Sequence, residues 1–164
     1  MNIAVWIFGA CGIISNFLIY TQNERRKMLF NKLVADCFWT LHYFMLGAWS
    51  GGAVCAVGIL RESVFINSDK KWAKGKKWLI VFLVLSACGT ALTWKNWFCI
   101  LPALASAISV FSFWKGNPCL TKKLAFPISV SFLTYDIYCR SYTGTVNELF
   151  VLTSVFISGI KKRC

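Results

Sequence analysis

Asp36, Trp39, His42 and Tyr43 are spaced to share one side of a helix. Asp36 and Tyr43 are seven residues apart, close to two turns of about 3.6 residues each, so their side chains point almost the same way. Around the helix axis, Trp39 lies about 60° to one side of this stripe, and His42 lies about 60° further round. Aromatic walls with a few convergent polar groups are typical of a small-solute pocket. The alternative is that this face only packs against other helices, with a neutral His42 as a hydrogen-bond donor to one of them.

Arg61 is the predicted partner of Asp36. An expected turn near Ala48 and Trp49 lies almost midway between them in the chain. In an antiparallel helical hairpin the two side chains then lie at nearly equal depth, roughly 18–20 Å from the turn at a rise of 1.5 Å per residue. Such an ion pair either fixes the register of the hairpin or belongs to a site for a solute or a proton.

Small and polar residues extend this candidate site. We expect Asn16 to hydrogen-bond across a helix bundle and to line the same path. Gly51 and Gly58, seven residues apart, form with Cys55 a stripe that allows another helix to approach closely. This stripe is interpreted as a packing feature.

A second polar group surrounds a turn near the end of the chain. It consists of Asp136, Arg140, Asn147 and Glu148. These residues form either an external polar mouth or a solvated rim, and we expect the rim.

The composition indicates what surrounds these residues. The 164-residue chain is 57% hydrophobic and 15% charged, and its formal net charge is +12. With a mean hydropathy of +0.60, it is expected to be an all-α integral membrane protein. The basic residues occur in short blocks between long apolar runs, whereas a nucleic-acid site would interleave basic and aromatic residues on one face. We therefore expect the partner to be a lipid bilayer, with no nucleic acid.

Seven segments are long and apolar enough to be candidate spans, since about 17–20 residues cross a hydrocarbon core about 30 Å thick. Helices are expected because lipid leaves the backbone no other hydrogen-bond partner. The segments are Ile3 to Tyr20, Met28 to Gly47, Ser50 to Ile66, Trp78 to Trp94, Trp97 to Trp114, Thr121 to Cys139 and Val146 to Ile160.

The distribution of charge predicts the orientation. Short cytoplasmic loops collect Lys and Arg. With seven spans and the N-terminus outside, the basic blocks and the C-terminus fall inside, while only Lys95 and Arg140 fall outside and Arg61 stays within a span.

A weak internal repeat suggests how the spans are grouped. A shift of 96 residues lays RRKMLF, from Arg25, over TKKLAF, from Thr121, and it pairs His42 with Tyr138. The prediction is a parallel 3+1+3 arrangement with units at 3–66 and 97–160 and a connecting helix at 78–94, because an extra span keeps two three-helix units in the same orientation. Tyr138 thereby joins the candidate pocket.

The first half of the chain also resembles a known family. The stretches IYTQNERRKMLFNKL, FWTLHYFMLGAWSGG and GILRESVF, between Phe17 and Phe65, are similar to the YgjV-type bacterial inner-membrane proteins. The resemblance implies a multi-pass protein of the bacterial inner membrane. Gln22 is similar to the glutamine of the PQ-loop motif of SWEET-like three-helix-repeat transporters, although Thr21 replaces the proline. Gln22 is therefore included in the candidate solute path.

Two functions follow from these observations. The chain is either a small-solute facilitator or transporter, or a structural or accessory membrane protein without transport activity. An enzyme is not expected, because no nucleophile with a base, no metal-ligand set around the single histidine and no phosphate-binding loop can be recognised. No cofactor and no metal are expected, and the oligomeric state is left open.

Overall fold

The computed structural model describes residues 3–22, 24–73 and 75–160. This part of the chain forms seven α-helices and one short 3-10 helix, and it contains no strand. The helices are α1 (Ile3–Thr21), α2 (Arg25–Met45), α3 (Trp49–Ile66), α4 (Lys77–Leu92), η1 (Trp97–Cys99), α5 (Ile100–Lys115), α6 (Pro118–Tyr138) and α7 (Tyr142–Ile160). The expected all-helical fold is confirmed.

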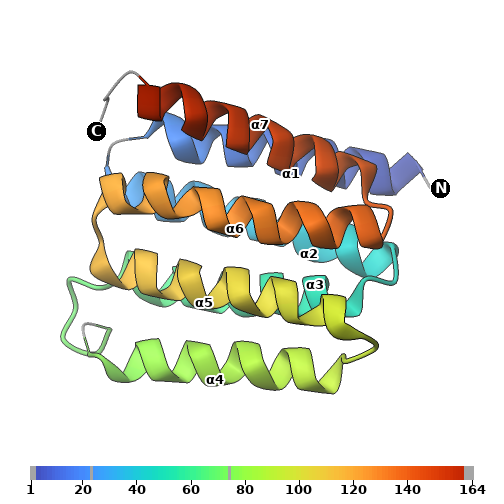
Figure 1. Cartoon of the computed structure of the whole chain (residues 1–164). Coiled ribbons are helices and arrows are strands. Elements are labelled where there is room, and N and C mark those ends of the chain that lie inside the picture. The colour runs from blue at the N-terminus through green and yellow to red at the C-terminus, as the bar shows by residue number, and fades with distance from the viewer. Residues whose placement is uncertain (1–2, 23, 74, 161–164) are drawn as a thin grey trace.

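Six of the helices form two layers of three. One layer contains α1, α2 and α3, and the other, in front of it in Figure 1, contains α7, α6 and α5. The layers meet where α1 packs on α7 and α3 packs on α5. Helix α4 lies along one edge, against α3 and α5.

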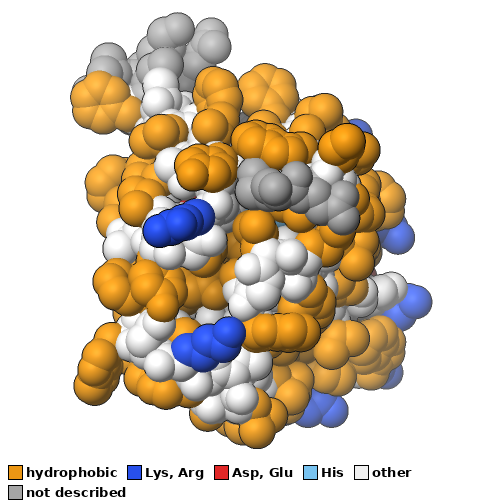
Figure 2. Space-filling view, turned by 90° about the vertical axis from the view of Figure 1, so that its right-hand side faces the viewer, with side chains coloured by type: hydrophobic (Ala, Val, Ile, Leu, Met, Phe, Trp, Pro, Cys, Tyr) orange, Lys and Arg blue, Asp and Glu red, His pale blue; other side chains and the backbone are white. Residues whose placement is uncertain are grey.

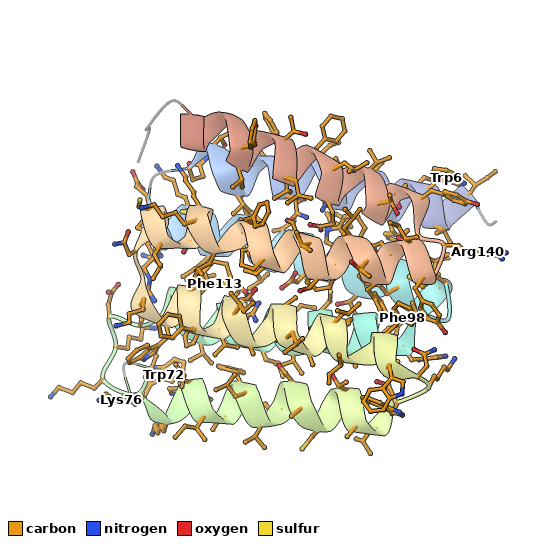
Figure 3. All side chains as sticks on the ribbon, in the orientation of Figure 1. Trp6, Trp72, Lys76, Phe98, Phe113 and Arg140 are labelled. Atoms are coloured by element: carbon orange, nitrogen blue, oxygen red, sulfur yellow. The ribbon has the colours of Figure 1, made fainter. Side chains whose placement is uncertain are left out.

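Successive helices run in opposite directions (Figure 1). The odd-numbered helices run from the end marked N toward the end marked C, and the even-numbered helices run back. Arg140 lies at the first end and Lys76 at the second (Figure 3). The two ends are called below the Arg140 end and the Lys76 end.

The helix boundaries agree with the predicted segments to within a few residues. The largest differences, of three or four residues, are at helix starts, including those of α2, α6 and α7. Asn117 accepts hydrogen bonds from the backbone N–H groups of Cys119 and Leu120, and Pro118 occupies the first turn, so α6 begins three residues early. Helix α7 begins at Tyr142, four residues before the predicted start at Val146.

Two segments meet the length and composition expected of a membrane span on their own. They are Trp49–Ile66 and Trp97–Lys115, while Ile3–Ile19 and Lys77–Leu92 are apolar but shorter, within the described residues. Helix α2 carries Lys32 and Asp36 in its middle, and α6 and α7 carry Asp136 and Glu148, which lowers their hydropathy.

Polar and apolar side chains are distributed in the reverse of the usual order for a water-soluble protein. Large apolar side chains such as Ile80, Phe126 and Phe150 are exposed on outward helix faces, while Asp36 and Glu62 are buried. The Arg140 end, viewed in Figure 2, also displays many hydrophobic side chains and few basic ones. This distribution fits an apolar surrounding.

Candidate functional site: a charged cavity between the layers

A cavity of about 60 Å³ lies between the two layers. All six layer helices contribute to its wall, and no described residue of α4 does. A cavity needs about 10–15 Å³ of such volume for each water molecule, so this one has room for about four. Its polar and charged lining residues are Asn16, Lys32, Asp36, Arg61, Ser106, Ser109, Ser129 and Glu148, beside Trp39 and Tyr43.

Four charged side chains form a network at one side of this cavity. Lys32 contacts Asp36 one turn further along α2. Arg61 Nη2 lies 3.8 Å from Asp36 Oδ2 and 2.8 Å from Oε1 of Glu62. The structure thus brings Asp36 and Arg61 together, but each has a closer partner on its own helix.

The network reaches α4 and α5 through Arg61. Its Nη1 donates to the carbonyl and to the hydroxyl oxygen of Ser106, both at 3.4 Å. Ser106 Oγ lies 2.8 Å from Ser86 Oγ of α4. The guanidinium also lies over the Phe113 ring, 5.5 Å from its centroid. Arg61 therefore joins α3 directly to α5, and Ser106 extends the network to α4.

Gly58 makes the space for the carboxylate of Asp36. A Cβ at position 58 would collide with Asp36 Oδ2. At Gly51 a Cβ would lie 2.8 Å from Tyr135 Cε1 and 3.2 Å from the Tyr43 ring. The two glycines thus admit side chains of α2 and α6 rather than a close helix backbone.

Tyr43 and Tyr135 lie between the cavity and the Arg140 end. Tyr43 lines the cavity, and its hydroxyl donates to Asp136 Oδ1 at 2.8 Å. The Tyr43 and Tyr135 rings are 6.1 Å apart. The Tyr135 hydroxyl accepts from the N–H of Gly51 at 3.0 Å and lies 2.7 Å from Ser50 Oγ. These contacts close the cavity toward that end.

Asn16, Asn147 and Glu148 join α1 to α7. Asn16 Nδ2 donates to Asn147 Oδ1 at 3.1 Å, and Asn147 Nδ2 donates to Glu148 Oε1 at 2.8 Å. The expected hydrogen bond of Asn16 across the bundle is present, and Asn16 and Glu148 line the cavity.

The expectation of a solvated rim is wrong for three of its four residues. Asp136, Asn147 and Glu148 are buried. The cause is the early start of α7, which places Asn147 and Glu148 more than one turn inside the helix. Only Arg140 is exposed, at the turn itself, where its backbone has φ 56°.

His42 does not line the cavity. Its Nδ1 lies 3.0 Å from the carbonyl oxygen of Val5, and its Nε2 lies 2.8 Å from Ser141 Oγ. It therefore anchors α2 to α1 and to the turn before α7. This matches the packing alternative for this residue.

Trp39 lines the cavity from α2. Its indole packs against Gly12 of α1, where a Cβ would lie 2.7 Å from Trp39 Cε2. The indole N–H is buried and has no hydrogen-bond partner among the residues that the structure describes.

Gln22 and Tyr138 lie away from the cavity. Tyr138 is exposed and stacks on Phe98 with ring centroids 4.5 Å apart, at the Arg140 end (Figure 3). Its hydroxyl accepts from Asn96. Gln22 lines a surface hollow with Glu24 and other residues near the start of α2.

Several residues of the cavity wall and of the charged network beside it were not predicted. Lys32 lies one helical turn before its partner Asp36. Glu62 directly follows its partner Arg61 in the sequence. That proximity could have indicated them. Ser106 and Ser129 carry no such signal, because a serine in an apolar helix has many possible roles.

The buried charges, the polar cavity and the outward apolar surface define a helical membrane protein. The chain belongs to the Imp-YgjV family of bacterial inner membrane proteins, whose family model matches residues 3–163. The protein is thus a bacterial inner membrane protein, and the likeness extends well beyond the stretch between Phe17 and Phe65. Neither a curated protein nor a solved structure is detectably similar to the chain.

Proposed function

We propose that the protein is a small-solute facilitator or transporter of the bacterial inner membrane. The observation that carries the proposal is the cavity, which is lined by residues of the six layer helices and by charges of both signs. Charged residues inside a membrane are costly and most often mark a path for an ion or a solute. We do not expect enzymatic activity or a cofactor.

The proposal includes seven spans in a 3+1+3 arrangement, with the N-terminus outside. Two facts support it. Helices α1 and α5 run in the same direction, as do α2 with α6 and α3 with α7. A half-turn about an axis parallel to the helices would exchange α1 with α5 and α3 with α7 in the two layers of Figure 1. Such an axis passes between α2 and α6, and transporters built from parallel repeats bind their solute at the repeat interface.

The cavity limits the class of solute. Room for about four water molecules suits a polar molecule of about four or five non-hydrogen atoms. Lys32 and Arg61 on one side and Glu148 on the other offer both signs of charge. We therefore propose a small polar or zwitterionic solute.

A thermal-shift screen of small polar metabolites on the detergent-purified protein tests this function. We expect at least one compound to raise the unfolding midpoint. A cavity-filling variant, Ser109→Leu, should lose that shift because Ser109 lines the cavity. Ser63→Leu, on the exposed side of α3, is the matched control and should keep it. No stabilising compound, or an undiminished shift in Ser109→Leu, would contradict the proposal.

A structural or accessory role is the second candidate. The contacts of Arg61 with Asp36 of α2 and Ser106 of α5 favour it, because they join three helices, and Ser106 in turn contacts Ser86 of α4. This role requires no solute. It predicts that simultaneous neutral replacement of Lys32, Asp36, Arg61 and Glu62 preserves accumulation in the membrane.

A further inference from the structure

Two buried carboxyl groups form no ion pair in the part of the chain that the structure describes. Lys32 pairs with Asp36, and Arg61 pairs with Glu62. Asp136 and Glu148 remain. The neighbours that donate hydrogen bonds to them are neutral. They are Tyr43 and Ser141 for Asp136, and Asn147 and Ser129 for Glu148.

A neutral donor does not cancel the charge of a carboxylate. An ionised carboxylate at this depth in a membrane therefore requires a bound cation, or it must take up a proton and become neutral. The chain has only six acidic residues, and two of them are in this situation. Their burial is a cost that packing alone does not explain.

We propose that Glu148 is a proton-binding site of the cavity and that solute movement is coupled to the uptake and release of this proton. The coupling rests on the proposed transport function, whereas the proton site itself does not. Glu148 is the better placed of the two acids because it lines the cavity. When it releases the proton, the proton passes to water in the cavity and a carboxylate is left.

Asp136 is less suited to exchange with the cavity. Asp136 does not line the cavity, and its side chain is completely buried. The backbone of Gly144 is so close that a Cβ there would lie 2.5 Å from both the Cγ and the Oδ2 atoms of Asp136. This carboxyl group accepts a hydrogen bond from the hydroxyl of Tyr43, which lines the cavity.

A proton fits the surroundings of Glu148 better than a metal cation does. The titratable and charged groups that share the cavity with it are Lys32, Asp36, Tyr43, Cys55 and Arg61, from α2 and α3. From α1, α5 and α6 the lining residues are uncharged. The two cationic side chains repel a metal ion, and Asn147 directs an N–H group at one carboxylate oxygen. The proton neutralises the Glu148 carboxylate, and the remaining charges are those of the pairs Lys32–Asp36 and Arg61–Glu62, which sum to zero.

Infrared spectroscopy of the full-length protein in lipid vesicles tests the site without a solute. The carbonyl stretch of a protonated carboxyl group is resolved from the bands of a carboxylate. We expect wild-type protein to show such a band near neutral pH and to lose it in alkali. Glu148→Gln should remove it, while Glu24→Gln, at an exposed residue near the start of α2, should leave it unchanged. Identical spectra of wild type and Glu148→Gln would overturn the proposal.

A second measurement applies if Glu148→Gln does not accumulate. In wild-type protein with isotope-labelled glutamate, the band should shift, because the group is a glutamate and not an aspartate. An unshifted band, or no band, would overturn the proposal. The thermal-shift screen distinguishes failure of the proton site from failure of the transport function. A stabilising solute without the glutamate band contradicts only the proton site. The band without a stabilising solute contradicts only the transport function.

Discussion

Arg61 Nη2 lies 2.8 Å from Oε1 of Glu62, its neighbour in the chain, and 1 Å further from Asp36 Oδ2, at 3.8 Å. The closest ion pair of Arg61 is therefore local, although both acids are buried. Arg61 Nε also donates to the same Glu62 oxygen, at 3.1 Å. These two charge-assisted hydrogen bonds to one oxygen make Glu62 the residue most affected by loss of the guanidinium.

Arg61→Met should destabilise the protein by about 3–5 kcal/mol, because it leaves Glu62 as an uncompensated buried charge. The unfolding midpoint in detergent and the amount of protein in the membrane measure this effect. Lys27→Met is the control. Lys27 pairs with Glu24 where both side chains are more than half exposed, so its replacement should change stability by less than about 1 kcal/mol.

The double variant Arg61→Met with Glu62→Leu should recover most of the lost stability. It removes both charges, and Asp36 keeps Lys32 as its partner. A double variant as unstable as the single one would show that the contacts of Arg61 with Ser106 matter more than the pair with Glu62.

Gly58→Ala should destabilise the hairpin of α2 and α3 by about 1–3 kcal/mol, since the added methyl group collides with the Asp36 carboxylate. Gly89→Ala is the matched control in α4. Its Cβ would meet only Ala53 Cβ at 3.7 Å, so the better helix propensity of alanine should leave it neutral or stabilise it by up to about 1 kcal/mol. Thermal unfolding of both variants checks the prediction. Equal effects at the two sites would contradict it.

Tyr135→Phe should make the cavity more accessible from the Arg140 end. The substitution removes the hydrogen bonds to Ser50 and Gly51, worth about 1 kcal/mol, which corresponds to about fivefold in an opening equilibrium. Cys55, a buried free thiol of the cavity wall, is the reporter. With Cys55 as the sole cysteine, its labelling by a membrane-impermeant thiol reagent should be about fivefold faster.

Tyr138→Phe serves as the control for that experiment. The Tyr138 hydroxyl accepts from Asn96 at the exposed end of the bundle and not between the layers. Faster labelling of Cys55 in this variant too would argue against the assignment of Tyr135 as the closing residue.

The proposed orientation is tested by cysteine labelling in intact cells. Lys95→Cys should react with an impermeant reagent, and Lys71→Cys should react only after the cells are opened, because the basic blocks are expected inside. A reporter that is active only outside the cytoplasm should be silent when fused after Cys164. Labelling of Lys71→Cys in intact cells would reverse the orientation.

The helices could be predicted from the sequence because long apolar runs separated by basic turns leave few alternatives. The residues Asp36 and Arg61, at equal distance from one turn, do approach each other. Asn16, Trp39 and Tyr43 also meet at the cavity. For the residues of α2 and α3, the helical repeat and the length of one hairpin were sufficient.

The contributions of distant helices could not be predicted in the same way. Tyr138 was included because it matches His42 in a weak repeat, but neither lines the cavity. Glu148 was placed at a rim because the start of α7 was predicted four residues late, and a shift of one turn decides whether a side chain near a helix end is buried. Packing between the layers, which brings Glu148 to Asn16 through Asn147, leaves no periodic signal.

The pairing of charges within single helices has a consequence for biogenesis. Lys32 and Asp36 both belong to α2, and Arg61 and Glu62 both belong to α3. In the seven-span arrangement that we propose, each helix carries its own counter-charge into the bilayer as it leaves the translocon, where an isolated central charge costs about 2.5–3.5 kcal/mol. Neither helix has to wait for the other to be synthesised before its middle section is electrically neutral, and the contact between Asp36 and Arg61 can form afterwards within the membrane.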